Sequence, residues 1–184
     1  ALRSMARAMQ AAGVPYRLTS TLNIFEQPEV RQLWYLCQWV TLGADDETIT
    51  NLLLGPYLGW ASSEVREISE LSRRQPVGME TAMQLAKDNP KAQAAIKELM
   101  TWRSWAKDSG VSHFIYRLVF ETGVSKTWVA AAADSPRMVK VFEDLQLWLR
   151  HAQQYEHVAL DPSVAGYMAT FPKPPEIESD EVTG

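Results

Sequence analysis

Apolar residues recur three and four positions apart along most of the chain, which is the spacing of one buried helix face. The pattern is densest in residues 25–60. Its first helix is predicted to begin near Pro28, because proline is accepted in the first turn of a helix, and to end at Gly43. The buried face of this helix is predicted to include Val30, Leu33, Trp34 and Cys37.

The same spacing predicts further helices, separated by prolines, glycines and capping residues. Between a helix predicted over 2–12 and the helix that begins near Pro28, an extended piece is expected at 14–18 and a polar turn at 19–23. A further helix starts at 45–47, with Asp45 or Asp46 as its cap, and is broken at 55–56. The remaining helices are predicted over 2–12, 64–72, 79–86, 91–107, 111–121, 125–133, 136–152 and 161–171.

These elements define an all-α protein, an irregular multi-helix array with short connections and at most minimal strand near the N-terminus. Residues 172–184 carry three prolines and four acidic residues with almost no apolar content, which predicts a disordered or linking tail. Three tryptophans fall on predicted apolar faces and are expected in the core: Trp34, Trp102 and Trp148.

The composition suits one domain with a large core, since 46% of the 184 residues are hydrophobic. The net charge of −4 argues against a polyanion-binding surface over the whole chain but allows a local basic patch. No apolar run approaches the roughly 18 residues of a membrane span. We therefore expect no membrane partner and a cytoplasmic location.

Catalytic and metal-binding patterns are missing from the sequence. Its single cysteine and three histidines are dispersed at Cys37, His113, His151 and His157, without metal-ligand spacing. There is no phosphate-binding loop, no dinucleotide fingerprint and no nucleophile elbow. The carboxylate pairs 45/46, 143/144 and 180/181 are expected to be solvated helix starts and faces. The chain is therefore not expected to be an enzyme or to hold a cofactor.

One connection is a candidate binding element, a helix-hairpin-helix turn that precedes the helix 64–72. Such a turn presents backbone N–H groups that bind a phosphate oxygen without reading sequence. Ser62 or Ser63 is expected to cap the second helix, and Tyr57 and Trp60 are expected to be less buried than the other aromatic residues. The candidate DNA-contacting residues are Gly55, Tyr57, Gly59, Trp60, Ala61, Ser62, Ser63 and Arg66. The alternative is a plain turn between helices.

The order of motifs also resembles a known family. The segments Val14-Pro15-Tyr16-Arg17-Leu18, Ile24-Phe25-Glu26-Gln27-Pro28-Glu29-Val30-Arg31, Ala44-Asp45-Asp46 and Leu53-Leu54-Gly55-Pro56-Tyr57-Leu58-Gly59-Trp60 appear in this order. Together they resemble the 2B subdomain of UvrD/Rep/PcrA-type superfamily 1 DNA helicases. The chain departs from the family pattern at Leu58, where an arginine is usual, and at Ala61, where a second glycine is usual.

The resemblance implies an accessory helical subdomain, inserted in the motor of an ATP-dependent 3′-to-5′ DNA helicase that acts in DNA repair. Residues 1–18 would be a boundary segment from the motor, 19–171 the helical subdomain and 172–184 the acidic link back, so the two flanking segments should lie near each other. The implied partners are duplex DNA, contacted weakly through its backbone, and the parent's motor domains. ATP and Mg²⁺ would belong to the parent.

Two rival interpretations stay open from the sequence. The chain could be a free-standing helical module that binds protein through an apolar groove. It could also be a small enzyme with an unrecognised site, although a catalytic role for any histidine is not favoured.

Overall fold

The structure is a computed structural model that describes residues 18–22, 24–132, 135–175 and 177–181. The helix predicted over 2–12 lies outside the described residues, as does nearly all of the extended piece at 14–18. The described elements are β1 (Leu18–Leu22), the 3-10 helix η1 (Ile24–Glu26), α2 (Pro28–Leu42), α3 (Asp46–Leu54), α4 (Ser62–Arg74), α5 (Met79–Leu85), α6 (Pro90–Asp108), α7 (Val111–Phe120), α8 (Val124–Ala132), α9 (Pro136–Val158), α10 (Val164–Thr170) and β2 (Ile177–Glu181).

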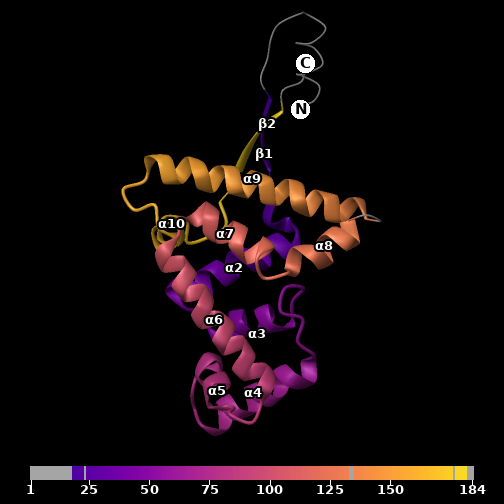
Figure 1. Ribbon diagram of the computed structural model, residues 1–184, viewed down its shortest axis with the longest axis vertical. Coiled ribbons are helices and arrows are strands. Elements are labelled where there is room, and N and C mark those ends of the chain that lie inside the picture. The colour runs from indigo at the N-terminus through magenta and orange to yellow at the C-terminus, as the bar shows by residue number, and fades with distance from the viewer. Residues whose placement is uncertain (1–17, 23, 133–134, 176, 182–184) are drawn as a thin grey trace, which may run out of the picture.

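The helices form an irregular array without bundle symmetry, which confirms the all-α prediction (Figure 1). The long helix α9 lies across one side of the molecule, and α2, α7, α8 and α10 pack beneath it. Helix α6 runs from this layer to a second group of helices formed by α3, α4 and α5. Within the described ranges, no helix combines the length and apolar character that crossing a bilayer requires.

The core is centred on aromatic side chains of α2, α9 and α10. The Phe25 ring meets the rings of Trp34 and Trp148 edge-on, with both centroid distances at 5.3 Å. The Trp148 indole N–H donates to the Tyr167 hydroxyl at 3.2 Å, which joins α9 to α10 within the core. Burial of Trp34, Trp102 and Trp148 confirms their predicted place in the core.

Several helix ends follow from local sequence signals. Pro28, Pro90 and Pro136 each stand in the first turn of a helix, where a missing N–H costs nothing. Gly43 ends α2 with a φ of 82°, a conformation that glycine adopts without strain. The start of α10 corrects the prediction, because Ser163, two residues beyond the predicted start at 161, accepts the capping hydrogen bond from Gly166.

Two strands correct the predicted turn at 19–23 and part of the predicted tail. β1 and β2 pair antiparallel from Leu18 opposite Glu181 to Leu22 opposite Ile177, and this ribbon projects from the α9 side of the helical body (Figure 1). The segments that enter and leave the helical body therefore lie side by side, as the resemblance implied.

The prediction that the carboxylate pair 143/144 is solvated is wrong for one of its members. Asp144 is buried within α9, and its Oδ1 atom lies 2.8 Å from the Lys140 ammonium one turn earlier. A second buried carboxylate, Glu29 at the start of α2, accepts two hydrogen bonds from Arg137 of α9, at 2.6 and 2.8 Å. Both carboxylates are thus paired with cations, as buried charges require.

Candidate nucleic-acid interface

The predicted hairpin is the connection between α3 and α4. Asp45 caps α3 by accepting the Thr48 N–H at 2.7 Å, which confirms one of its two predicted caps. After Gly55 the chain turns back: the N–H of Gly59 donates to Gly55 O, and that of Trp60 donates to Leu53 O, both at 2.8 Å. Gly59 has a φ of 63° and open space around its α-carbon, so its conformation selects glycine.

A glutamine from α2 holds α3 and the first half of the hairpin through two hydrogen bonds to their backbone. The Gln32 amide donates to Asn51 O at 2.9 Å and accepts from the Tyr57 N–H at 3.1 Å. Its amide nitrogen lies 1.2 Å from where a Cβ on residue 55 would stand, so any larger residue at Gly55 would displace the Gln32 amide. Gly55 is therefore covered by a side chain, and it contributes shape rather than a free contact surface.

Tyr57 anchors the hairpin to the rest of the molecule. Its hydroxyl donates to Leu118 O of α7 at 2.7 Å and lies 3.0 Å from the Thr122 hydroxyl. Its ring meets Trp102 and Trp128 edge-on, and burial raises the pKa of its hydroxyl. Tyr57 thus points inward, away from any ligand at the tip of the hairpin.

Trp60 is buried at 5% exposure, which corrects the expectation that an aromatic residue in this hairpin is less buried than the others. The Lys91 ammonium lies 5.2 Å from the centroid of its ring, a cation–π contact from α6. With Tyr57 also directed inward, neither aromatic residue of the hairpin is placed to stack on a base.

The start of α4 is occupied by a carboxylate of its own helix. Ala61 is the N-cap, which corrects the predicted Ser62 or Ser63, and its N–H donates to Glu64 Oε2 at 2.6 Å. The Lys91 ammonium donates to the same oxygen at 2.6 Å. These two bonds hold the pKa of Glu64 below its usual range, and the bond from Lys91 has the larger effect.

Five of the eight predicted contact residues are exposed on one surface. They are Gly59, Ala61, Ser62, Ser63 and Arg66. The N–H groups of Ser62 and Ser63 have no hydrogen-bond partner among the described residues. The Arg66 side chain is 74% exposed and lies 4.0 Å from Glu70, a separation that leaves its guanidinium free to reorient.

Three residues that hydrogen-bond to the hairpin or to the start of α4 were missed by sequence reasoning: Gln32, Glu64 and Lys91. A glutamate three positions after a helix N-cap is a recognised capping signal, so Glu64 could have been found. No local signal marks Gln32 or Lys91, because each reaches the hairpin from another helix.

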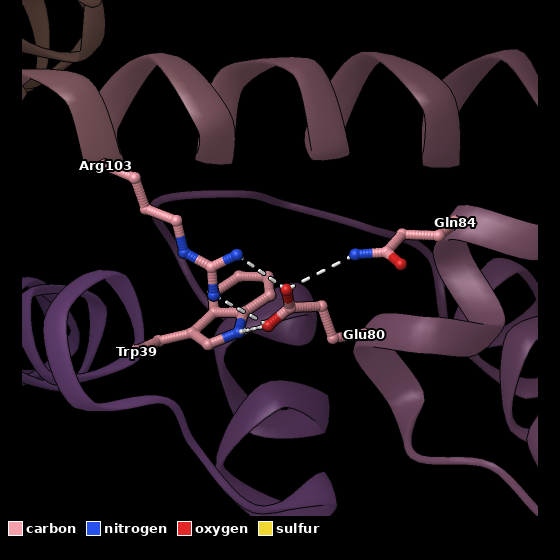
Figure 2. Close-up of polar contacts among 4 residues, drawn as sticks. All are labelled: Trp39, Glu80, Gln84 and Arg103. Atoms are coloured by element: carbon pink, nitrogen blue, oxygen red, sulfur yellow. Dashed lines mark hydrogen bonds and ion pairs between the residues drawn. The ribbon is translucent and has the colours of Figure 1, made fainter.

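A polar cluster outside the hairpin joins α2, α5 and α6 (Figure 2). Glu80 accepts the Trp39 indole N–H at 2.9 Å and two hydrogen bonds from Arg103 at 2.7 and 3.0 Å. Partial burial acts to raise the pKa of Glu80, but the bonds from Arg103 and Trp39 outweigh it and the pKa is lowered. Each charged group here is matched, so the cluster is a structural tie between helices.

The single cysteine and His151 pack among residues of the core. Burial raises the pKa of the Cys37 thiol, so this residue is a protonated core side chain. Nδ1 of His151 lies 2.8 Å from the Tyr167 hydroxyl, in the aromatic core. Within the part of the chain that the structure describes, no group of three or more histidine, cysteine or acidic side chains could hold a metal ion.

Comparison with protein-family models and with curated proteins finds no match. The functional argument therefore rests on the residues and contacts described above.

Proposed function

We propose that the chain is a helical accessory subdomain of the 2B type, carried by a superfamily 1 DNA helicase, and that it contacts duplex DNA through the α3–α4 hairpin. The observation that carries the proposal is the ribbon, in which Leu18 lies opposite Glu181. Segments that enter and leave a domain side by side are what insertion into another domain requires. In this proposal the strands β1 and β2 connect the helical body to the parent protein.

The hairpin supports the second half of the proposal. It presents two backbone N–H groups and the exposed Arg66 at the start of a helix, and helix N-termini bind phosphate oxygens. Glu64 opposes an anion there, while Lys91 offsets part of its charge. We therefore expect weak, sequence-independent and strongly salt-dependent binding.

In this proposal the chain modulates a motor and has no ATPase of its own. ATP and Mg²⁺ are bound by the parent helicase, which unwinds DNA in the 3′-to-5′ direction in the cytoplasm during repair. Hydrolysis of ATP by the purified chain would contradict this assignment.

The test is duplex-DNA binding over a salt series with two charge variants. Ser63→Asp adds a carboxylate beside the free N–H groups, at a helix position where acidic residues favour folding. Arg66→Glu reverses the exposed cation. Both variants should weaken binding and flatten its salt dependence, whereas matched variants at exposed sites on other helices, Ser104→Asp and Arg150→Glu, should not. Equal losses in all four variants would contradict a hairpin site.

A further inference from the structure

The connection between α9 and α10 exposes aliphatic side chains to an unusual degree. Val158 is 83% exposed and Leu160 is 106% exposed, the largest values among the exposed large hydrophobic residues of the described chain. In Figure 1 this connection stands out at the edge of the molecule, beyond α10. Neither side chain gains stabilisation from burial within the fold, and exposed apolar groups that cluster commonly mark interaction surfaces.

The backbone of this connection is nevertheless firmly held. The Tyr155 hydroxyl donates to Asp161 O at 2.8 Å, and the Ser163 N–H donates to Asp161 Oδ1 at 3.1 Å. Gly166 packs so closely on Asp161 that a Cβ there would lie 2.5 Å from the Asp161 carbonyl oxygen. The backbone around Asp161 is therefore already ordered, which reduces the entropy that a partner must overcome on binding.

An apolar groove adjoins this connection. Its volume is about 670 Å³, within the roughly 300–1,000 Å³ range of ligand pockets. It lies between the end of α2, the end of α6 and the start of α10, and Leu42 on one wall is 55% exposed. Its lining residues are Val40, Thr41, Leu42, Gly43, Arg103, Ala106, Lys107, Ser163 and Ala165. Ser163 belongs both to the groove and to the end of the held connection, so the two features adjoin.

The charge of the groove is the opposite of that of the whole chain. Both charged lining residues, Arg103 and Lys107, are cationic, whereas the chain carries a net charge of −4. Arg103 is already matched by Glu80 (Figure 2). Lys107 is exposed and has no ion pair among the described residues, so it can meet a carboxylate from outside.

We propose that the groove together with Leu42, Val158 and Leu160 is a docking surface for an acidic segment of a partner protein that carries aliphatic side chains. The aliphatic side chains of the partner fill the groove and pack on Leu160. A carboxylate of the partner pairs with Lys107 at the rim. This surface is separate from the hairpin, and the inference does not depend on DNA binding.

The test is selection of a displayed random peptide library on the folded full chain. Enriched peptides should be acidic and should contain aliphatic residues. Synthetic copies of them should bind about tenfold or more weakly to Leu160→Asp, Leu42→Asp and Lys107→Glu. Leu85→Asp is the matched control, because Leu85 is also exposed but lies on α5, away from the groove. Leu160→Asp should keep the unfolding midpoint of the wild type, since its side chain packs on nothing.

Three outcomes would overturn the proposal. Enriched peptides that bind the groove variants and Leu85→Asp equally would place docking elsewhere. Concentration-dependent self-association that is abolished by Leu160→Asp would make a second copy of the chain the occupant. Displacement of the peptides by duplex DNA, together with DNA binding that Lys107→Glu abolishes, would make the groove a nucleic-acid site.

Discussion

Two connections in this molecule are fastened in the same way but expose opposite chemistry. In the α3–α4 hairpin the Tyr57 hydroxyl donates to Leu118 O at 2.7 Å, and in the α9–α10 connection the Tyr155 hydroxyl donates to Asp161 O at 2.8 Å. The hairpin turns its aromatic residue Trp60 inward and leaves small residues and N–H groups outside. The α9–α10 connection leaves Leu160 wholly in solvent.

The difference shows that rigidity alone does not identify what a loop binds. A held loop that presents N–H groups and a cation suits an anion, because the donors are fixed and unpaired. A held loop that presents aliphatic side chains suits an apolar partner, because burial of those side chains is the gain on binding. The exposed side chains therefore decide between the two kinds of partner.

The largest expected effect compares the apolar residues of the two connections. Trp60→Ala should lower the free energy of unfolding by about 3–5 kcal/mol, because a buried ring is removed and a cavity is left. Leu160→Ala should change it by no more than about 0.5 kcal/mol, because the side chain is fully exposed. Urea denaturation followed by circular dichroism measures both. Equal losses would show that the two connections are packed alike.

The second comparison removes the two hydroxyl anchors. Tyr57→Phe should cost about 1–1.5 kcal/mol, because it removes a hydrogen bond in a largely buried site and leaves its acceptor with one fewer donor. Tyr155→Phe should cost less, about 0.5 kcal/mol, because water can replace its hydroxyl in the exposed connection. The same denaturation experiment applies. A larger loss for Tyr155→Phe would mean that the α9–α10 connection is the more tightly held of the two.

Much of the fold was predictable because its signals are local. Pro28 and Pro136 at helix starts, Gly43 at a helix end and the apolar stripe of α9 each act within one or two turns. The direction of Trp60 was not predictable, since the space that it fills is made partly by Lys91 on α6. The ribbon was missed because its two strands lie far apart in the sequence and neither carries a clear alternating pattern.

The candidate site shows the same limit. Glycines marked the hairpin correctly, yet the need for Gly55 comes from Gln32, which is 23 positions earlier in the chain. Sequence reasoning placed the turn and could not say which of its residues face solvent.

The third comparison asks whether Gly55 and Gln32 act as one unit. Gly55→Ala should destabilise the wild type, because the Gln32 amide must leave its two hydrogen bonds to admit the new methyl group. In a Gln32→Ala background the same substitution should be nearly neutral, since the obstacle is gone and the φ of residue 55 suits alanine. A double-mutant cycle should give a coupling of about 1 kcal/mol. Additive effects would show that Gln32 is not what makes glycine necessary.

The smallest expected effect concerns Glu64, the one feature of the hairpin that opposes an anion. Because hydrogen bonds lower the pKa of Glu64 below its ordinary value of 4.5, its carboxylate contributes stability that is present above pH 4.5 and is lost as the pH falls through the lowered pKa. Glu64→Gln should therefore be slightly less stable than the wild type at neutral pH and equal to it in acid. The measurement is urea denaturation at a series of pH values.

The same variant should strengthen duplex binding while it weakens the fold. Removal of a negative charge beside the Ser62 and Ser63 N–H groups should raise the affinity for duplex DNA by less than about tenfold and leave Lys91 free to pair with a phosphate. Glu143→Gln, at an exposed position on α9, is the matched control and should leave the affinity unchanged. Lower stability together with higher affinity for duplex DNA would show that Glu64 stabilises the fold at the expense of DNA binding. A loss of affinity in Glu64→Gln would instead mean that the carboxylate holds the N–H groups in place for the phosphate.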